Sequence, residues 1–337
     1  MRSVLKPVVA GPAVAAVTVV GALVATHRAG VPFRDPDHVV GKRLTLVALL
    51  VLALVGLDIL VRGGRSWARI RAVARERWHR ERRWAVASAI VSFYVTYLAY
   101  RNLKSVVPLV RPGELFDQQL SAWDRSLLGG NDAAELIHQL IGTGAATHVL
   151  SAVYGFFILF LPLSLALALV FSRHLFGGVF YATALSINWP LGALTYLLLP
   201  AVGPAYAAPA EFTTLPETHV LHVQHLMLQQ RLDFIHHPLA HDAAQNIAAF
   251  ASLHISMMLT AVLAAHIVGL SRAWRIGLWV LLGLTALATL HLGWHYVMDD
   301  LAAVPMAITA IVGARALTGF ARRAPGRLGV PVPVGAD

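Results

Sequence analysis

The feature that most constrains this chain is a series of eight apolar runs, each near the length of a membrane-spanning helix. Such a helix needs about 17–25 mostly apolar residues, because every backbone polar group must bond within the segment. The runs occupy residues 8–26, 44–61, 84–100, 146–171, 175–200, 247–270, 276–294 and 301–317. Apolar residues make up 57% of the chain and charged residues 13%, against about half and a quarter in a soluble domain. We therefore predict an all-α, polytopic transmembrane bundle of about eight spans.

The positions of the arginines predict the orientation of this bundle. Nine of them lie between the second and third runs: Arg62, Arg65, Arg69, Arg71, Arg75, Arg77, Arg80, Arg82 and Arg83. A loop this basic belongs in the cytoplasm, so both termini are expected there as well. Alternation then places three polar segments together on the outer side: residues 101–124, residues 201–254 and the stretch around His295.

The net charge of +10 follows from this loop distribution and does not indicate a nucleic-acid partner, because aromatic and basic residues do not interleave on one surface. The chain has no cysteine, which excludes disulfides and thiolate chemistry.

Two outer loops have distinct character. Residues 114–147 alternate apolar and charged side chains, which favours an amphipathic helix lying in the membrane interface. Residues 201–246 carry turn-forming glycine and proline together with a tract of six histidines, at positions His219, His222, His225, His236, His237 and His241. Such a tract can bind a metal. Its three-residue steps drift around a helix, however, so we interpret these residues as exposed histidines of the outer loop.

Three short polar groups stand at the expected outer boundary. Lys104 and Arg111 are two cations that can bind an oxyanion. Interface anchoring is the common alternative for such residues, but positive charges at outer helix ends run against the usual bias. Ser252 and His254 open the sixth run, where a helix N-terminus binds anions and an imidazole can act as a general acid.

The third group is the pair His295 and Asp299. If the chain is helical from Trp294, the two share a helix face, and the carboxylate can hold one ring nitrogen of the imidazole. Two other interpretations remain open: a polar pair that pins two helices together, and a metal site formed with His291.

Taken in order, Lys-x6-Arg-Pro, Ser-x-His and His-x3-Asp resemble the type-2 phosphatidic acid phosphatase superfamily. Within it, Ser252-Leu253-His254 and His295-Tyr296-x-x-Asp299 are similar to the branch that contains the inositol phosphorylceramide synthases, and Gly203-Pro204 after Pro200 is similar too. The resemblance implies three parts: residues 1–83 as two added helices with a basic cytoplasmic loop, residues 84–317 as a six-helix catalytic core, and residues 318–337 as a basic cytoplasmic tail.

The resemblance also implies roles. His295 would be the nucleophile that becomes phosphohistidine, Asp299 would orient it, and His254 would protonate the leaving alkoxide. Phosphate oxygens would be bound by Lys104, Arg111 and Ser252. No metal or other cofactor is required.

One position departs from the family pattern. The superfamily has a Ser-Arg pair whose arginine stands six residues before the nucleophile, and this chain has Ala288 and Thr289 there. His291 or Arg101 is a candidate substitute for this arginine.

We expect an enzyme of the plasma membrane that cleaves a lipid phosphate at the extracytoplasmic face. Transfer of the phosphoryl group to an alcohol such as inositol or a sugar is the alternative, and a transporter with a His/Asp relay is the alternative of another class.

Overall fold

All regular structure in the described part of the chain is helical, as the sequence predicted. The computed structural model describes residues 2–172, 175–240 and 244–320. Eight long helices form the body of the molecule: α1 (Arg2–Arg28), α2 (Val39–Gly63), α4 (Arg80–Val110), α7 (Ala145–Phe171), α8 (Leu175–Leu198), α11 (Leu253–Val268), α12 (Arg272–His291) and α13 (Val297–Thr318). Shorter helices connect them: α3 (Trp67–Glu76), α5 (Asp117–Leu127), α6 (Ala133–Ile141), α9 (Pro204–Ala207) and α10 (His219–His236), with 3-10 turns at Pro36–His38 and Pro209–Phe212.

Each predicted apolar run forms one of the long helices. Five of these are long and apolar enough to cross a membrane by composition alone, namely α1 from Pro7, α2, α7, α12 and α13. Three others complete the body: α4, α8 and the shorter apolar α11. The chain therefore has the helices of an integral membrane protein, and the exact count of eight spans stays a prediction.

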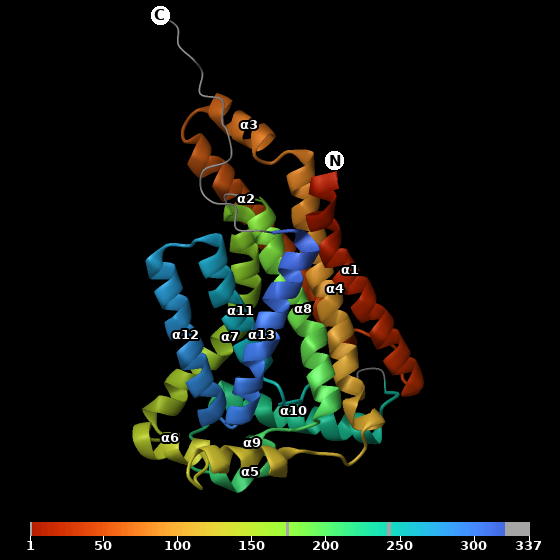
Figure 1. Cartoon of the computed structure of the whole chain (residues 1–337), viewed down its shortest axis with the longest axis vertical. Helices are drawn as coiled ribbons and strands as arrows, with labels where there is room; N and C mark the ends of the chain where they lie inside the picture. The colour runs from red at the N-terminus through yellow and green to blue at the C-terminus, as the bar shows by residue number, and fades with distance from the viewer. Residues whose placement is uncertain (1, 173–174, 241–243, 321–337) are drawn as a thin grey trace, which may run out of the picture.

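The long helices run up and down the bundle, with the connecting segments gathered at its two ends (Figure 1). The N-terminus and α3 lie at one end, and α5, α6, α9 and α10 cover the other (Figure 1). Helix α8 contacts α1, α4, α7, α11 and α13, and its Phe180 and Leu185 are fully buried. The core of the bundle is therefore centred on α8, and α1 packs along α4 against it.

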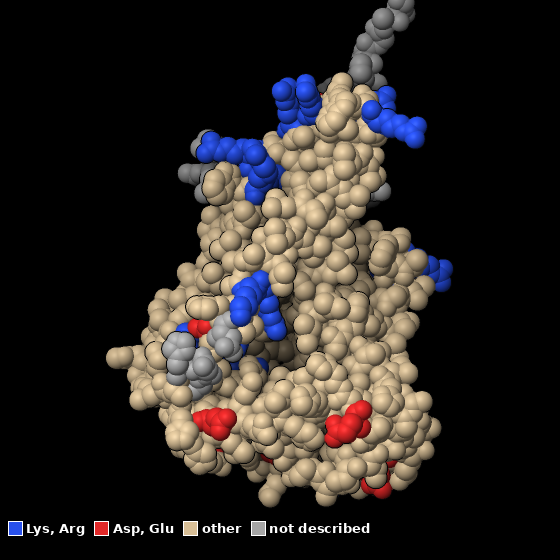
Figure 2. Space-filling view, turned by 180° about the vertical axis from the view of Figure 1, so that it is seen from behind, with Lys and Arg blue, Asp and Glu red and all other residues tan. Residues whose placement is uncertain are grey.

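The two ends of the bundle differ in charge. On the face shown in Figure 2, several lysine and arginine side chains lie at the end that carries α3 and others lie lower down, whereas the acidic side chains seen on it lie towards the opposite end. At the basic end, the buried carboxylate of Asp58 accepts hydrogen bonds from Arg62 Nε and Arg77 Nε, both at 2.7 Å, and from Trp78 Nε1 at 3.1 Å. This carboxylate ties α2 to the segment that leads into α4, so the basic loop is held against the bundle.

Three element boundaries differ from the sequence prediction. The segment 114–147 forms two helices and the start of a third, because Gly129, Gly130 and Gly142 adopt positive φ and break it. The sixth long helix begins at Leu253 and not at 247, since Ser252 caps it. Helix α4 continues through Pro108 to Val110, so Lys104 lies inside a helix and not beyond its end.

The separation of α3 from α6 gives a direct test of topology. The chain has no cysteine, so single cysteines can be introduced at the exposed positions Arg71 in α3 and Leu140 in α6. We expect a membrane-impermeant maleimide to label Leu140→Cys in intact cells, because the positive-inside rule leaves the acidic end outside. Arg71→Cys should be labelled only after permeabilisation, and labelling of both variants from the same side would contradict this topology.

Candidate active site

The pair His295 and Asp299 is joined by a hydrogen bond. Nδ1 of His295 lies 3.2 Å from Oδ2 of Asp299, and both side chains are buried. Since a carboxylate only accepts hydrogen bonds, Nδ1 carries the proton and Nε2 keeps its lone pair for chemistry. The structure thus contains an imidazole whose tautomer and orientation are fixed by one carboxylate.

The local geometry of this pair differs from the prediction. Helix α13 begins at Val297, so His295 lies in an extended segment before the helix and shares no helix face with Asp299. Asp299 is the third residue of the helix, and its Oδ2 also accepts the backbone N–H of Tyr296 at 3.0 Å. The i,i+4 spacing indicated the contact correctly, but a helix-capping carboxylate produces it.

A second carboxylate holds the same helix end from outside. Asp124 of α5 accepts the backbone N–H groups of Val297 at 2.7 Å and Met298 at 3.0 Å. These N–H groups have no partner within the helix. Burial raises the pKa of Asp124 above its usual range, although the two N–H bonds lower it. Helix α5 is therefore the support on which the start of α13 rests.

His254 stands in the first turn of α11, facing His295. The two rings have centroids 5.8 Å apart, so both can reach a single small group placed between them. The rings of Tyr154 and Phe157 from α7 pack on His254 at 4.6 and 4.3 Å, and Trp294 stacks on Tyr154 at 5.0 Å. Aromatic side chains thus fix the position of this second imidazole.

Ser252 joins the two halves of the site. Its hydroxyl caps α11 by accepting the N–H of Ile255, and its own N–H donates to the carbonyl oxygen of Asp299 at 3.1 Å. The N-terminus of α11 is thereby fastened beside the start of α13. A helix N-terminus of this kind presents free N–H groups to an anion.

Lys104 approaches this group from α4. Its Nζ donates to the carbonyl oxygen of Asn246 at 3.0 Å and lies over the ring of Tyr100, and its charge acts on His254. The segment that leads to Ser252 is held to α4 by Gln245, whose amide donates to the carbonyl oxygen of Lys104 at 2.6 Å. The structure therefore brings Lys104, Ser252, His254, His295 and Asp299 into one region.

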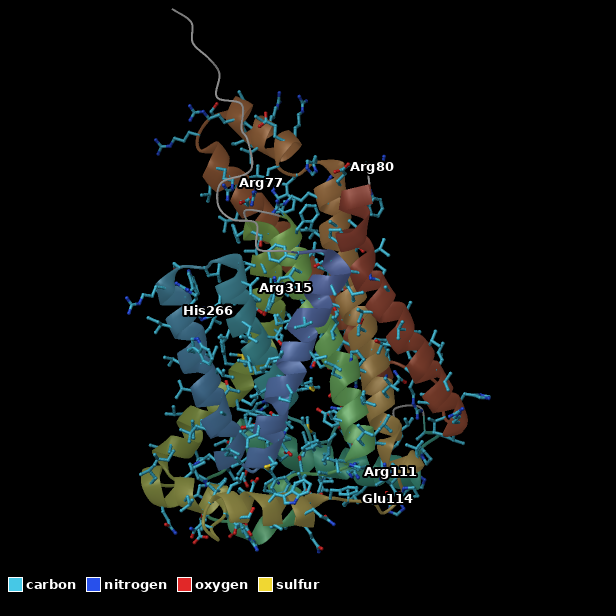
Figure 3. All side chains as sticks on the ribbon, in the orientation of Figure 1. Arg77, Arg80, Arg111, Glu114, His266 and Arg315 are labelled. Carbon is cyan, nitrogen blue, oxygen red and sulfur yellow. The ribbon has the colours of Figure 1, made fainter. Side chains whose placement is uncertain are left out.

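Three other residues that the sequence predicted for the site form hydrogen bonds or ion pairs with groups outside it. Arg111 pairs with Glu114 and donates to the carbonyl oxygen of Leu197; Figure 3 shows Arg111 and Glu114 beside each other at the end of the bundle opposite Arg77 and Arg80. This arginine lowers the pKa of Glu114.

Arg101 forms an ion pair with Asp35. His291 is buried and hydrogen-bonds through Nε2 to Thr147, and its carbonyl oxygen contacts His138. Each of these two candidates for the arginine expected at Thr289 is thus bonded to a group other than the proposed catalytic residues.

Four histidines of the tract lie in helix α10 and not in an irregular loop, namely His219, His222, His225 and His236, and His237 directly follows the last residue of the helix. No group of three or more metal-ligating side chains occurs in residues 2–172, 175–240 and 244–320. His291, His295 and Asp299 are accordingly not gathered into such a group. His241 lies outside the described residues.

The loop after α8 packs directly against the segment that carries His295. Asp117 of α5 accepts the N–H of Gly203 at 2.8 Å and the hydroxyl of Tyr296 at 3.1 Å. The N–H of Ala205 donates to the carbonyl oxygen of Gly293 at 2.8 Å. Burial and this carboxylate raise the pKa of Tyr296, so its hydroxyl remains a donor.

Comparison with known proteins decides the family. The PAP2 superfamily matches residues 118–313, more than half of the chain. The chain belongs to the PAP2 superfamily. Members of this superfamily are phosphoesterases, so the chain is a membrane enzyme of the phosphatase or phosphotransferase type. No curated protein and no solved structure matches it.

The PAP2 match covers Ser252, His254, His295 and Asp299, whereas Lys104 and Arg111 precede it. Asp117 also precedes it, and Asp124 falls within it. Both carboxylates support the site, and sequence reasoning missed them because their partners lie more than 80 residues away along the chain. The one available signal was that two acidic residues of α5 recur at a seven-residue interval, which places them on one helix face.

A glycine pair tests how tightly the site is supported. Gly203 and Gly130 have nearly equal φ values of +96° and +95°, but a Cβ on Gly203 would lie 2.5 Å from the carbonyl oxygen of Trp294, whereas Gly130 faces open space. Alanine at either positive-φ position costs about 1–3 kcal/mol of backbone strain, and at Gly203 roughly 1–3 kcal/mol more for the clash. We expect Gly203→Ala to lower the thermal midpoint in detergent well below that of Gly130→Ala. Equal midpoints would contradict the close packing of this loop on the His295 segment.

Proposed function

We propose that this PAP2 protein cleaves a lipid phosphoester or diphosphoester through a phosphohistidine intermediate on His295. The observation that carries this proposal is the buried His295–Asp299 hydrogen bond with the ring of His254 at 5.8 Å. One imidazole is oriented as a nucleophile, and a second stands within reach of the same phosphoryl group. If water accepts the phosphoryl group, the protein is a lipid phosphate phosphatase, which is the function that we propose.

The first chemical step forms a phosphorus–nitrogen bond. Nε2 of His295 attacks the phosphorus atom, the bond to the alkoxide of the lipid breaks, and His254 gives its proton to that alkoxide. The imidazole of His295 becomes positively charged, and the carboxylate of Asp299 stabilises this charge.

In the second step the oxygen of water attacks phosphorus and the phosphorus–nitrogen bond breaks. The electron pair of that bond returns to His295, and His254 takes the proton of the attacking water. Phosphate leaves, and both imidazoles regain their starting protonation states. The sequence of steps needs no metal or cofactor.

In this proposal, hydrogen-bond donors and one cation near the helix ends bind the phosphoryl group. Lys104 supplies a positive charge, and Ser252 with the first N–H groups of α11 supplies hydrogen bonds. Arg111 is already paired with Glu114, so it binds phosphate only if that exposed pair opens. Phosphoryl transfer depends mainly on such positioning and charge stabilisation.

The basic end of the bundle supports a location for this chemistry. If α3 and both termini are cytoplasmic, the histidines face the extracytoplasmic side of the plasma membrane. A lipid phosphate substrate reaches them from the outer leaflet.

A second candidate is transfer of the phosphoryl group to an alcohol such as inositol or a sugar, as in the inositol phosphorylceramide synthase-like branch. Thr289 favours it, because this position lacks the arginine that the resemblance leads one to expect. In that reaction an alcohol hydroxyl replaces water in the second step, with the same transfer of its proton to His254.

A transporter with a His/Asp relay is less consistent with the structure. Such a relay needs ionisable groups near the middle of the membrane. His254 lies in the first turn of α11 and Asp299 in the first turn of α13, so both lie at one end of the bundle.

The nucleophile is tested by His295→Ala. Purified protein should release phosphate from a lipid phosphate in detergent containing EDTA, and the substitution should lower turnover by roughly 10⁴-fold, as loss of a nucleophile does elsewhere. Acid-labile ³²P should be trapped on the wild type and not on the variant. His222→Ala in α10 is the control and should keep wild-type turnover. Near-wild-type activity of His295→Ala would reject the assignment.

The acid is tested by His254→Ala with two leaving groups. Loss of a proton donor matters most for an alkoxide and least for a nitrophenolate, which leaves without protonation. We expect turnover of a lipid phosphate to fall by about 10²–10⁴-fold, with a much smaller fall for p-nitrophenyl phosphate. Equal losses on both substrates would show that His254 acts in some other way.

A further inference from the structure

Asp300, the residue after the orienting carboxylate, also lies in this region. Its Oδ2 is 3.2 Å from the hydroxyl of Thr289, and the side chain of Ser252 is within hydrogen-bonding range. The carboxyl group interacts electrostatically with His295 and Asp299. Asp300 is therefore placed between the cap of α11 and the end of α12, beside the proposed nucleophile.

One oxygen of this carboxyl group has no partner. Oδ1 of Asp300 is buried and makes no hydrogen bond to any described residue. Oδ1 of the neighbouring Asp299 is also buried without a partner among the described residues, whereas both oxygens of Asp58 and both of Asp124 are bonded. A buried polar atom without a partner costs roughly 1–3 kcal/mol, so this oxygen is expected to gain a partner when the site is filled.

The chemistry of the expected ligand limits what Asp300 can do. The non-bridging oxygens of a phosphoryl group accept hydrogen bonds and carry negative charge. A carboxylate beside them repels them, whereas a carboxylic acid donates its O–H to them, as a protonated aspartic acid does in some oxyanion holes. The hydroxyl of Thr289 at Oδ2 leaves Oδ1 as the position for that proton.

We propose that Asp300 binds the phosphoryl group directly, by donating a hydrogen bond from its carboxylic acid to a non-bridging oxygen. This inference rests on the proposed function and adds a residue to its site. Asp300 then supplies the contact that an arginine at position 289 would otherwise make. Thr289 takes part by holding the other carboxyl oxygen, which aims Oδ1 at the ligand.

Two substitutions distinguish a role of Asp300 as a hydrogen-bond donor from a purely structural role of its carboxyl group. Asp300→Asn keeps a neutral N–H donor in nearly the same volume, and Asp300→Ala removes the donor. Binding of inorganic phosphate to the purified full chain is measured by isothermal titration, so the result does not depend on turnover. We expect Asp300→Ala to weaken phosphate binding about 10–100-fold, the effect of losing a hydrogen bond to a charged group. Asp300→Asn should stay within about threefold of the wild type.

A rescue experiment adds a measurement that would not change if Asp300 had only a structural role. Thr289→Arg combined with Asp300→Ala restores a donor at the same place and should recover most of the lost phosphate affinity. Thr285→Val is the matched control for position 289, because Thr285 is buried one turn earlier on α12 and bonds only to the carbonyl oxygen of Leu281 among the described residues. It should leave phosphate affinity unchanged.

Equal weakening by Asp300→Asn and Asp300→Ala, or no weakening by either, would overturn the proposal. If Asp300→Ala does not fold, Asp300→Leu fills the volume without a donor and takes its place in the comparison. Failure of the proposed function has a different signature: phosphate binds and depends on Asp300, yet no phosphohistidine forms on His295.

Discussion

The site depends on one constraint, which is that backbone N–H groups at a helix start near lipid must find partners. At the start of α13 the N–H groups of Tyr296, Val297 and Met298 are satisfied by two carboxylates, Asp299 and Asp124. The oxygen of Asp299 that bonds to the backbone also bonds to His295. The carboxylate that caps the start of α13 therefore also orients the imidazole of His295. The geometry of the proposed nucleophile is as stable as this helix cap.

The same principle explains why the short helices matter. Asp117 and Asp124 both belong to α5, which is neither long nor apolar enough to cross a membrane. From one face they hold the loop after α8 and the start of α13, which are far apart in sequence. A helix lying across the end of the bundle thus converts several separate helix ends into one rigid site. Carboxylates suit this task because each oxygen can accept two backbone N–H groups.

Much of this arrangement could be predicted from the sequence, and the limits have a physical cause. Apolar length predicted the long helices, and i,i+4 spacing predicted the contact of His295 with Asp299, because both are local properties. Spacing could not tell that Arg111 would pair with Glu114 or that His291 would face Thr147. It also could not reveal Asp124, since its partners Val297 and Met298 are brought near only by folding. Where a side chain has several possible partners, tertiary packing determines which one it contacts, and a spacing pattern carries no information about that packing.

The charges near the histidines suggest how such a site can hold a phosphoryl group with few cations. Lys104 is the described cation whose charge acts on His254, while Arg111 is largely neutralised by Glu114. Hydrogen-bond donors must therefore contribute much of the stabilisation, and their effect grows as water is excluded and the local dielectric falls. Aromatic rings pack on His254, and the helices α5, α6 and α10 lie over this end of the bundle (Figure 1). In the proposed reaction, neutral donors at helix ends would stabilise the phosphoryl group inside this cover, which would make the cover part of the proposed phosphate-binding chemistry.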